Sequence, residues 1–464
     1  MNAATDPSSF QVPRRVGMIS LGCAKNLVDA EIMLGSAKSE GFEITADPAE
    51  ADVLIVNTCG FIDSAKQESI DAILEAARQR NEGKRPDAKI IVSGCLSQRF
   101  STDLVGELPE VDAFIGLDQV AEAGAIFRRV LEEDTSSVLN LVTPKSRYIP
   151  DFATPRFRLT PNHSAYVKIA EGCNHPCSFC VIPQMRGRHR SRALDSVVRE
   201  IRGLVAEGVK EINLISQDTT YYGMDLWDEK AGPRQPVDAS RGTSLIHLLD
   251  EIGEIGGEFW VRLLYTHPAH WSDDLIAAIA RNPHVARYVD MPLQHIHADM
   301  LKLMRRETSR EHIENLITRI RAGIPDIGLR TTFIVGFPGE TEEHFESLLA
   351  FIEETRFERL GVFNYSQEDG SRAAKMDNQI PARTKNRRYR EAMKLQQRIA
   401  REMAESRTGQ TLRVLVETPN SGRTEYDAPE VDCRVILTQP AEVGTFLNAK
   451  ILGAQTYDLV ADPI

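Results

Sequence analysis

The sequence predicts an α/β protein in three parts: a doubly wound parallel sheet, a barrel or partial barrel of six βα units, and a small all-β module. Three observations lead to this prediction. Apolar runs of strand length alternate with helical patterns near the N-terminus, a second such series begins at Tyr166, and the last sixty or so residues change to β-like runs. At 464 residues the chain is too long for a single core, which favours two to three domains.

In the N-terminal part, helix-like segments follow β-like runs. The runs are "VGMISLGC" at 16–23, "ADVLIVNTC" at 51–59, "AKIIVSGC" at 88–95 and "VDAFIGL" at 111–117. A helical pattern spans about Asn26 to Glu40, and Asp63 is the expected N-cap of the next helix. An Ala/Glu/Arg-rich helix after the fourth run completes a βαβα order, which predicts the doubly wound parallel sheet.

The second series supplies six candidate strands separated by helical stretches. They are "YVKIAEG", "EINLIS", "WVRLLYT", "YVDMPLQ", "LRTTFIVG" and "RLGVFNYS". This arrangement predicts the barrel or partial barrel. A polar insert rich in Pro and Gly at 223–244 is expected to be a surface loop. Residues 143–161 carry four prolines and are expected to connect two domains.

The C-terminal β-like runs are "TLRVLVE", "CRVILT" and "FLNAKILGAQTYDLV". We therefore expect an N-terminal domain at 14–132, a linker at 133–158, a central domain at 159–396 and the β module at 397–464. The N-terminal segment shows no apolar region typical of a secretory signal, and no apolar run approaches the roughly 18 residues of a membrane span. These features predict a cytoplasmic protein without a membrane partner.

Charge and cysteine content narrow the function classes. The chain has 55 basic and 67 acidic residues, a net charge of −12. This balance is mildly unfavourable for a protein whose main partner is nucleic acid and suits a basic partner better. In a reducing compartment, the seven cysteines are more often ligands, catalysts or buried small side chains than disulfides.

Three of the cysteines lie within eight residues, with the spacing Cys173-x3-Cys177-x2-Cys180. A structural zinc site normally has four closed ligands, so zinc would need a further donor such as His175 or His189. A [4Fe–4S] cluster held by three thiolates instead leaves one iron open to a co-substrate. The spacing therefore favours an iron–sulfur cluster over zinc.

This triplet, with the aromatic Phe179 before its last cysteine and a position just after the first strand of the series, resembles the signature of the radical SAM superfamily. The resemblance implies that S-adenosylmethionine (SAM) chelates the open iron through its amino and carboxylate groups. It also implies that Phe179 contributes to the cofactor site, that Gln217 contacts the ribose or methionine end, and that Ile334 and Gly336 contact the adenine. For Gly336, turn chemistry is an equal alternative.

Cys23, Cys59 and Cys95 each close a predicted parallel strand. Adjacent parallel strands end at the same edge of a sheet, so the three thiols are expected to converge there. The alternative is three cysteines buried as small apolar residues. This region resembles the N-terminal domain of the methylthiotransferase family, which implies a second [4Fe–4S] cluster on the three thiols. With the radical SAM core and a module that resembles a TRAM domain, the resemblance covers nearly the whole chain; Cys433 matches no motif and is expected to serve packing.

The resemblance to methylthiotransferases implies two uses of SAM. One SAM methylates a sulfur carried on the N-terminal cluster, and a second is cleaved by one electron to a 5′-deoxyadenosyl radical. The radical removes hydrogen from an unactivated C–H, and the carbon radical captures the methylthio group. Because C–H homolysis needs no general base, we expect no catalytic residue beyond the cluster ligands; the barrel excludes water and positions the carbon. An electron donor such as flavodoxin or ferredoxin and a sulfur source are also implied.

The family has two branches: one modifies adenosine beside the tRNA anticodon, and the other modifies an aspartate of a small-subunit ribosomal protein, protein twelve. From Met403 to Ile464 there are nine acidic and five basic residues, a net charge of about −4. A β module that grips RNA should be basic, whereas an acidic one suits a basic ribosomal protein. The segments "SLGCAKNLVDAE", "NTCGFIDSAKQES" and "CVIPQMRGRHRSR" also resemble the ribosomal-protein branch.

We therefore expect methylthiolation of an aspartate β-carbon in protein twelve, either free or within the small ribosomal subunit. The alternative is 2-methylthiolation of a tRNA adenosine next to the anticodon. The acidic surface expected to recognise the ribosomal protein comprises Glu425, Asp427, Glu430 and Asp432. An iron–sulfur electron carrier is disfavoured, because carriers saturate their irons with protein ligands and both cysteine sets here leave one iron open.

Two basic stretches oppose the acidic balance. The first contains the arginines at 186, 188, 190 and 192, and the second spans residues 383–402. We expect the first to bind a cofactor carboxylate or structural acids and the second to form a solvated helix face. Contact with ribosomal RNA near the target is the alternative for both.

Overall fold

A computed structural model describes residues 13–83, 85–133 and 137–464. They form two compact units. The first contains the described residues up to Tyr148 together with Ala153–Leu159, and the second contains Ile149–Phe152 and Thr160–Ile464. The predicted linker at 133–158 thus contributes to both units, and residues 134–136 of it lie outside the described part of the chain. The domain bounds expected from the sequence stay predictions.

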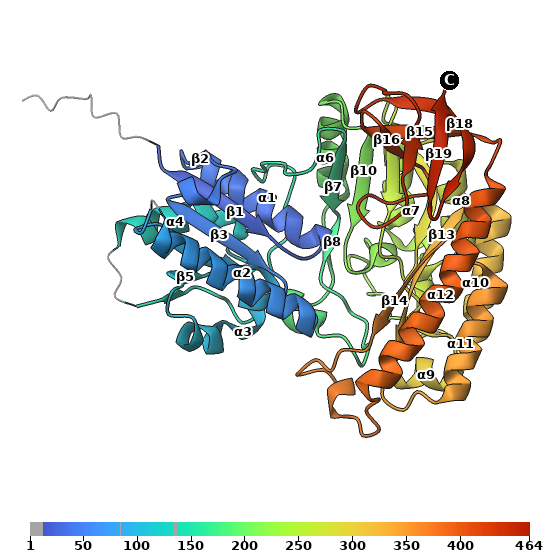
Figure 1. Ribbon diagram of the computed structural model, residues 1–464, viewed down its shortest axis with the longest axis horizontal. Helices are drawn as coiled ribbons and strands as arrows, with labels where there is room; N and C mark the ends of the chain where they lie inside the picture. Colours follow the sequence, from blue (N-terminus) through green and yellow to red (C-terminus); the bar gives the residue numbers. More distant parts are fainter. Residues whose placement is uncertain (1–12, 84, 134–136) are drawn as a thin grey trace, which may run out of the picture. The chain divides into compact units, whose positions relative to one another are not determined.

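The first unit is built on a parallel sheet with the strand order β2-β1-β3-β4-β5-β6 (Figure 1). Its strands are β1 (Arg15–Ser20), β2 (Glu43–Ile44), β3 (Val53–Thr58), β4 (Lys89–Ser93), β5 (Ala113–Phe114) and β6 (Leu139–Asn140). The four predicted strands form the centre of this sheet. The edge strands β2 and β6 escape sequence analysis because two residues are too few to show a period.

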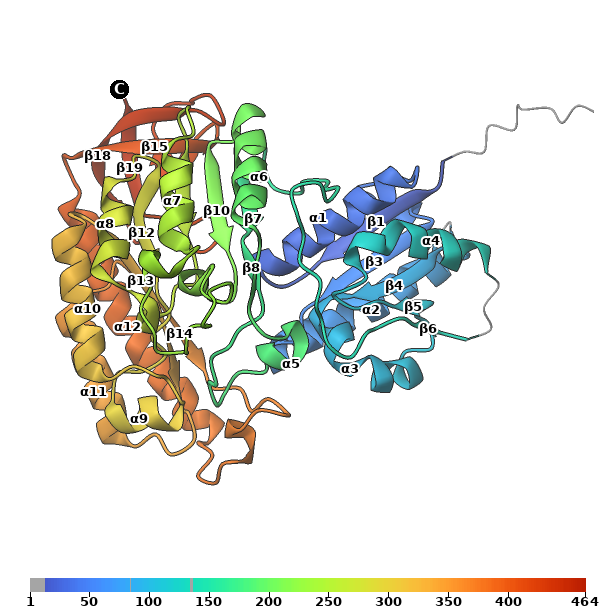
Figure 2. The same cartoon turned by 180° about the vertical axis from the view of Figure 1, so that it is seen from behind.

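Helices cover both faces of this sheet, with α2 on one side and α4 on the other (Figures 1 and 2). The α-helices of the unit are α1 (Ala24–Ser39), α2 (Asp63–Glu82), α3 (Gly94–Glu107) and α4 (Ala123–Glu132), and short 3-10 turns lie at Pro48–Glu50 and Val120–Glu122. This arrangement confirms the doubly wound sheet. The expected N-cap of α2 is wrong by one residue: Ile62 is the N-cap, and Asp63 is the first helical residue, 2.6 Å from Lys66.

The second unit contains an open parallel sheet with the order β14-β13-β12-β11-β10-β7, which confirms the six predicted strands. They are β7 (Ser164–Lys168), β10 (Glu211–Ile215), β11 (Trp260–Leu263), β12 (Val285–Asp290), β13 (Gly328–Val335) and β14 (Arg359–Asn364). Two short strands, β8 (Ala170–Glu171) and β9 (Arg190–Ser191), pair antiparallel beside it. The sheet is a partial barrel, because β7 and β14 do not pair with each other.

Seven helices of this unit contribute apolar residues to one large buried cluster with the sheet. They are α6 (Leu194–Ala206), α7 (Leu245–Gly253), α8 (Asp273–Arg281), α9 (Ala298–Leu303), α10 (Arg310–Gly323), α11 (Glu342–Thr355) and α12 (Ala382–Ser406). The short α5 (Ile182–Arg186) lies outside this cluster. The insert at 223–244 is only partly a surface loop, because Met224, Trp227 and Val237 are buried in the same cluster. Within the described residues, no helix is both long enough and apolar enough to cross a membrane.

The C-terminal module is a closed β-barrel with the order β15-β16-β17-β19-β18. Its strands are β15 (Thr411–Thr418), β16 (Ser421–Thr424), β17 (Val435–Leu437), β18 (Phe446–Gln455) and β19 (Asp458–Pro463). Sequence analysis misses β16 and treats β18 and β19 as one run. The two are separated by a turn at Thr456, whose φ of 62° lies in the left-handed region. The predicted border between the central domain and this module, 396/397, falls inside α12.

A buried ion network fixes the module to the amino ends of the central strands. Arg423 of β16 lies 2.5 Å from Glu211, the first residue of β10, and Arg262 of β11 lies 2.9 Å from the same carboxylate. All three side chains are buried. Burial favours the neutral acid, but the two guanidinium charges lower the pKa of Glu211 to about 2. Removing one partner would leave uncompensated buried charge, so the loss of any one member of this network is expected to be strongly destabilising.

Two of the four residues expected to form the acidic recognition surface belong to this attachment instead. Asp427 accepts a hydrogen bond from Arg359 Nε at 2.9 Å. Asp432 accepts one from the Tyr288 hydroxyl at 2.6 Å and lies 3.4 Å from Arg330. The carboxylates of Asp427 and Asp432 are buried. The expectation of a four-residue acidic surface is therefore wrong for these two residues, whose charges hold the module on the barrel.

The basic stretch at 383–402 lies within α12. Arg387 and Arg398 are half-exposed and pair with acidic residues of α11 and α12. Arg388 is buried, with Nη1 2.6 Å from the Glu340 carboxylate. The stretch is thus a solvated helix face with one buried arginine.

Candidate metal centres

The N-terminal cysteine set comprises Cys23, Cys59 and Cys95. Cys23 is the N-cap residue between β1 and α1, Cys59 follows β3, and Cys95 is the second residue of α3 after β4. Because β1, β3 and β4 are adjacent and parallel, the three residues leave the sheet at the same edge. A Cβ on Gly22 would lie 3.4 Å from Cys59 Sγ, and one on Gly60 would lie 2.8 Å from the Cys95 carbonyl oxygen. The backbone next to Cys23 therefore lies against Cys59, and the backbone next to Cys59 lies against Cys95.

Side chains and glycines shape this edge. Asn26 Nδ2 donates to the carbonyl oxygens of Leu21, at 2.7 Å, and Thr58, at 3.1 Å, which joins the ends of β1 and β3. Gly22 and Gly94, each directly before a cysteine, have φ values of 93° and 91°. At Gly94 a Cβ would lie 2.4 Å from the Thr58 carbonyl oxygen, so a larger residue would displace the backbone.

The exposure of the set is graded. Cys23 is exposed, Cys59 is half-buried and Cys95 is buried. Three cysteines at one sheet edge supply three thiolates, one fewer than the four irons of a cubane cluster. The donor set fits a [4Fe–4S] cluster with one open iron.

The barrel cysteine set comprises Cys173, Cys177 and Cys180, in the loop after β8. The Cys173 N–H donates to the Gly187 carbonyl oxygen and the Cys180 N–H to that of Cys177, both at 3.2 Å. Gly172 has a φ of 79°, and a Cβ there would lie 2.2 Å from the Arg188 carbonyl oxygen. This tight turn, closed by β8 and β9, fixes the path of the loop that carries the three thiols.

The barrel thiols fit a metal cluster chemically. Burial raises the pKa of Cys173 well above its usual range, with a contribution from the neighbouring thiols, and raises that of Cys180 to about 12. Such thiols lose their protons when a metal ion binds them. Arg306 Nη1 lies 3.6 Å from Cys177 Sγ and places positive charge beside them. Three clustered thiols and an adjacent cation fit an anionic iron–sulfur cluster with one open iron.

The structure brings together two of the residues expected to contact SAM. Phe179 and Ile334 are half-buried and pack against one small apolar cluster that includes Met304 and Phe337. Phe179 lies in the cysteine loop and Ile334 in β13, so the cluster joins two sides of the partial barrel. Their side chains form an apolar wall next to the cysteine loop.

Gln217 is anchored close to the same loop. Its Nε2 donates to Glu171 Oε2 at 3.1 Å, and Glu171 stands two positions before Cys173. Gln217 Oε1 is buried and meets no hydrogen-bond donor within the described residues. Burial opposes ionisation of Glu171, but Arg186 and Lys168 lower its pKa to about 2. Gln217 thus presents a fixed acceptor for a hydroxyl or ammonium group.

Gly336 follows β13 and has a φ of 71°. A Cβ there would lie 2.3 Å from Lys385 Cγ, and the Gly336 N–H donates to Glu340 Oε2 at 2.6 Å. The geometry supports the turn role of this glycine and also leaves its backbone free of a side chain.

The arginines beside the cysteine loop are held by protein groups. Arg186 lies 2.8 Å from Glu171, and Arg192 lies 2.5 Å from Glu200. Arg190 Nη1 donates to the carbonyl oxygens of Arg186 and Arg188. The expected pairing with structural acids is therefore correct for Arg186 and Arg192.

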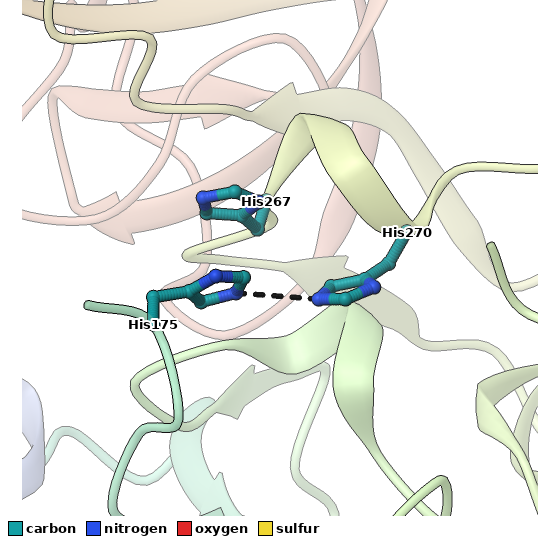
Figure 3. Close-up of side chains that lie close together, drawn as sticks. All are labelled: His175, His267 and His270. Carbon is teal, nitrogen blue, oxygen red and sulfur yellow. Dashed lines mark hydrogen bonds between the residues drawn. The ribbon is translucent and has the colours of Figure 1, made fainter. Parts of the chain in front are cut away.

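Three histidines lie close together, and one of them belongs to the cysteine loop (Figure 3). His175 belongs to the cysteine loop, while His267 and His270 follow β11. The rings of His175 and His267 stack with centroids 3.6 Å apart and planes 13° apart. His175 Nε2 and His270 Nε2 lie 3.2 Å apart.

His175 is held between two carboxylates. Its Nδ1 lies 2.7 Å from Glu307 and its Nε2 lies 2.7 Å from Asp218. Burial favours the neutral ring, but these hydrogen bonds raise the pKa of His175 to about 9. Burial also opposes ionisation of Asp218, yet the nearby histidines hold its pKa well below the usual range. With both nitrogens of His175 engaged, it is a poor fourth ligand for a zinc site.

Of this network, sequence analysis singles out only His175. Asp218, His267 and His270 stand a few residues after β10 and β11, at the same strand ends as Gln217. Examining every polar residue at those carboxyl ends would have found them.

Comparisons with known proteins agree with this architecture. Residues 15–116 match the uncharacterized protein family UPF0004, residues 167–352 match the Radical SAM superfamily, and residues 408–464 match the TRAM domain. A similar solved structure is that of the radical S-adenosylmethionine methyltransferase TsrM from Kitasatospora setae. It has 16% identity and a TM-score of 0.53 and covers 75% of this chain and 72% of that chain, a likeness of fold alone. The fold and the cysteine loop define a radical SAM enzyme.

Relatives that match nearly the whole chain show to which family of radical SAM enzymes it belongs. The ribosomal protein uS12 methylthiotransferase RimO of Opitutus terrae is 58% identical over 97% of this chain and 96% of that protein. The proteins of the same name from Akkermansia muciniphila and Desulforamulus reducens are 54% and 45% identical over 97% and 96% of this chain and 100% and 99% of theirs. The chain belongs to the RimO family of methylthiotransferases. It is a radical SAM methylthiotransferase, and its cofactors are two [4Fe–4S] clusters and SAM.

Proposed function

We propose that this chain adds a methylthio group to the β-carbon of an aspartate in the small-subunit ribosomal protein uS12. The observation that carries the proposal is 58% identity, along 97% of the chain, to a protein named for this substrate. The net charge of −12 suits a basic protein partner. Modification of a tRNA adenosine is not favoured, because the three relatives described above all carry the uS12 name.

In this proposal the barrel cysteine set holds the cluster that binds SAM, and the N-terminal cysteine set holds the second cluster. When bound, the first supplies the electron that cleaves SAM and the second supplies the sulfur of the methylthio group. The protein's own contribution is positioning. Gln217 offers an acceptor to a hydroxyl or ammonium group of SAM, Phe179 and Ile334 flank the adenine, and Gly336 permits close approach of its backbone.

The remaining parts of the proposal concern partners and location. A flavodoxin or ferredoxin supplies the electrons, a separate sulfur source replenishes the transferred sulfur, and the reaction takes place in the cytoplasm. The substrate is either free uS12 or the assembled small subunit. The C-terminal module lies at the amino ends of the central strands, at the opposite end of the partial barrel from the cysteine loop. It therefore suits docking of a large partner at a distance from the reacting carbon.

The test uses enzyme loaded with both clusters, SAM and a reductant. It is incubated separately with uS12, with small ribosomal subunits and with unmodified tRNA, and each product is examined by mass spectrometry. We expect the methylthio mass on one aspartate of uS12. Mass gain on tRNA alone would overturn the substrate and leave the methylthiotransferase class intact.

A further inference from the structure

His267 is a buried residue whose position couples it to the site of SAM cleavage. It stands just after β11, and its ring stacks on His175, which lies between two ligands of the barrel cysteine set (Figure 3). The side chain is 5% exposed. No role in cluster ligation or in the expected SAM contacts accounts for it.

The hydrogen bonds of His267 define its tautomer. His267 Nδ1 accepts a hydrogen bond from the Ala269 backbone N–H at 3.2 Å, as the N-cap of a short 3-10 turn. Nδ1 must therefore carry a lone pair, and the ring proton resides on Nε2. Nε2 is buried, and no group within the described residues accepts a hydrogen bond from it. A buried donor without an acceptor is unfavourable, so its presence beside a reaction site points to a ligand.

The three histidines are a poor site for a metal ion, although their ligand atoms lie within 4.8 Å of one another. The lone pairs of an imidazole lie in the plane of its ring, and the stacked rings of His175 and His267 cannot both aim at one ion. His267 Nε2 also carries a proton. The available group is a hydrogen-bond donor, which selects an acceptor atom instead of a cation.

A second donor indicates that the acceptor is anionic. Burial lowers the pKa of His267 well below its usual range, and the positive charge of the nearby Arg306 lowers it further. Its Nη2 donates to the Pro292 carbonyl oxygen at 2.7 Å, and its Nη1 contacts Cys177. Its Nε is buried and meets no acceptor within the described residues. A guanidinium beside a neutral N–H donor favours a carboxylate.

We propose that His267 is a specificity-determining residue whose Nε2–H donates to the side-chain carboxylate of the substrate aspartate. The inference rests on the proposed function, because it takes an aspartate as the substrate. In that residue the carboxylate is bonded directly to the β-carbon, so one hydrogen bond beside the cysteine loop orients the carbon that reacts. The methionine carboxylate of SAM is a rival source of the same chemistry, and the experiment separates the two.

Two substitutions at His267 each keep one of its two hydrogen-bonding functions and remove the other. His267→Asn keeps an acceptor at the Nδ1 position for Ala269, and asparagine is a favoured N-cap, but its amide does not reach the Nε2 position. His267→Gln places an amide N–H near the Nε2 position and gives up the cap. Both are compared with the wild type as cluster-loaded enzymes. The measurements are the Kd for SAM, and the Kd for uS12 and for uS12 carrying asparagine in place of the modified aspartate.

We expect wild type and His267→Gln to prefer the aspartate form of uS12, and His267→Asn to lose about tenfold of that preference. The loss in uS12 binding should exceed any loss in SAM binding by a similar factor. The proposal is overturned if His267→Asn keeps the preference, if both variants lose it equally, or if the main loss is in SAM affinity. A wild-type enzyme that leaves uS12 unmodified would instead contradict the proposed function, which is a separate result.

Discussion

The two cysteine sets reach similar donor groups by different means. The N-terminal set takes one cysteine from each of three strand ends, so the order of strands in the sheet brings them together. The barrel set lies in one loop and depends on local contacts, such as Gly172 against Arg188 and the pairing of β8 with β9. The comparison teaches that sheet topology can replace a short motif in bringing three cysteines to one place, and it predicts that the two sets can be disabled separately.

The largest expected effect comes from replacing Cys173, Cys177 and Cys180 by alanine. Protein reconstituted without oxygen should fall from about eight irons per chain to about four, since one [4Fe–4S] cluster is lost. Cleavage of SAM should stop, because the lost cluster is the one proposed to bind SAM and supply the electron. The N-terminal cysteine set is not expected to replace it. Iron analysis and detection of 5′-deoxyadenosine check this result. A variant that still carries two clusters would refute the ligand assignment.

Replacing Cys23, Cys59 and Cys95 by alanine should lower the iron content by the same amount but should affect a different step of the reaction. SAM cleavage to 5′-deoxyadenosine should continue, while the methylthio product disappears. The control is circular dichroism and iron analysis, which must show a folded chain with one cluster. If such a variant fails to cleave SAM, the proposed division of labour between the two sets is wrong.

A substitution in the ion network that attaches the C-terminal module should destabilise the protein without changing either cysteine set. Glu211→Gln leaves Arg262 and Arg423 buried without their carboxylate and should reduce the free energy of unfolding by about 3 kcal/mol. Because the folded pKa of Glu211 is lowered to about 2, its stabilising effect is present above the unfolded value of 4.5 and fades as the pH falls toward 2.

Denaturant unfolding between pH 2 and pH 6 measures this effect. The wild type should lose more stability than Glu211→Gln on acidification. Glu258→Gln, at an exposed ion pair with Arg413, is the matched control and should change stability by less than about 1 kcal/mol. Equal acid sensitivity of wild type and Glu211→Gln would contradict a stabilising role of the ionised Glu211 between Arg262 and Arg423.

Glycines before the ligands give smaller and selective effects. Gly172→Ala should lower cluster filling at the barrel set, and Gly94→Ala should do so at the N-terminal set. At both positions φ is positive and the added Cβ would meet a carbonyl oxygen, which costs at least about 1–2 kcal/mol locally. Iron content and SAM cleavage distinguish the sets. Gly203→Ala, on α6 with open space around it, is the control; identical behaviour of all three variants would refute the prediction.

The smallest expected effect concerns the charge of the C-terminal module. With Asp427 and Asp432 assigned to the attachment, Glu430 and Glu442 are the exposed acids to test. Changing both to lysine should weaken binding of uS12 a few-fold at low salt and less at high salt, since exposed charges act mainly on encounter. Titration at two salt concentrations measures this. Tighter binding of uS12 to the double variant would exclude an acidic docking surface.

The sequence predicted the larger elements, because strand periodicity is visible within a single stretch of the chain. The same stretches display both cysteine sets, whose roles as cluster ligands stay predictions. Sequence analysis missed what depends on partners distant in the chain. From the sequence alone, Asp427 and Asp432 are predicted to be surface charges. The structure shows that they are buried against Arg359 of β14 and Arg330 of β13. His267 and His270 carry no local signal, and their meaning arises only when the cysteine loop lies against the ends of β10 and β11.

The topological origin of the N-terminal set has a consequence for how the enzyme matures. Cys23, Cys59 and Cys95 are separated by whole βα units, so they meet only after β1, β3 and β4 have paired, a non-local and comparatively slow event in folding. The barrel set lies within eight residues, in the loop between β8 and β9, so its thiols depend on pairing much closer in the chain. If the two sets hold clusters as proposed, the N-terminal cluster requires a sheet that has already formed, whereas the barrel cluster requires only its own loop.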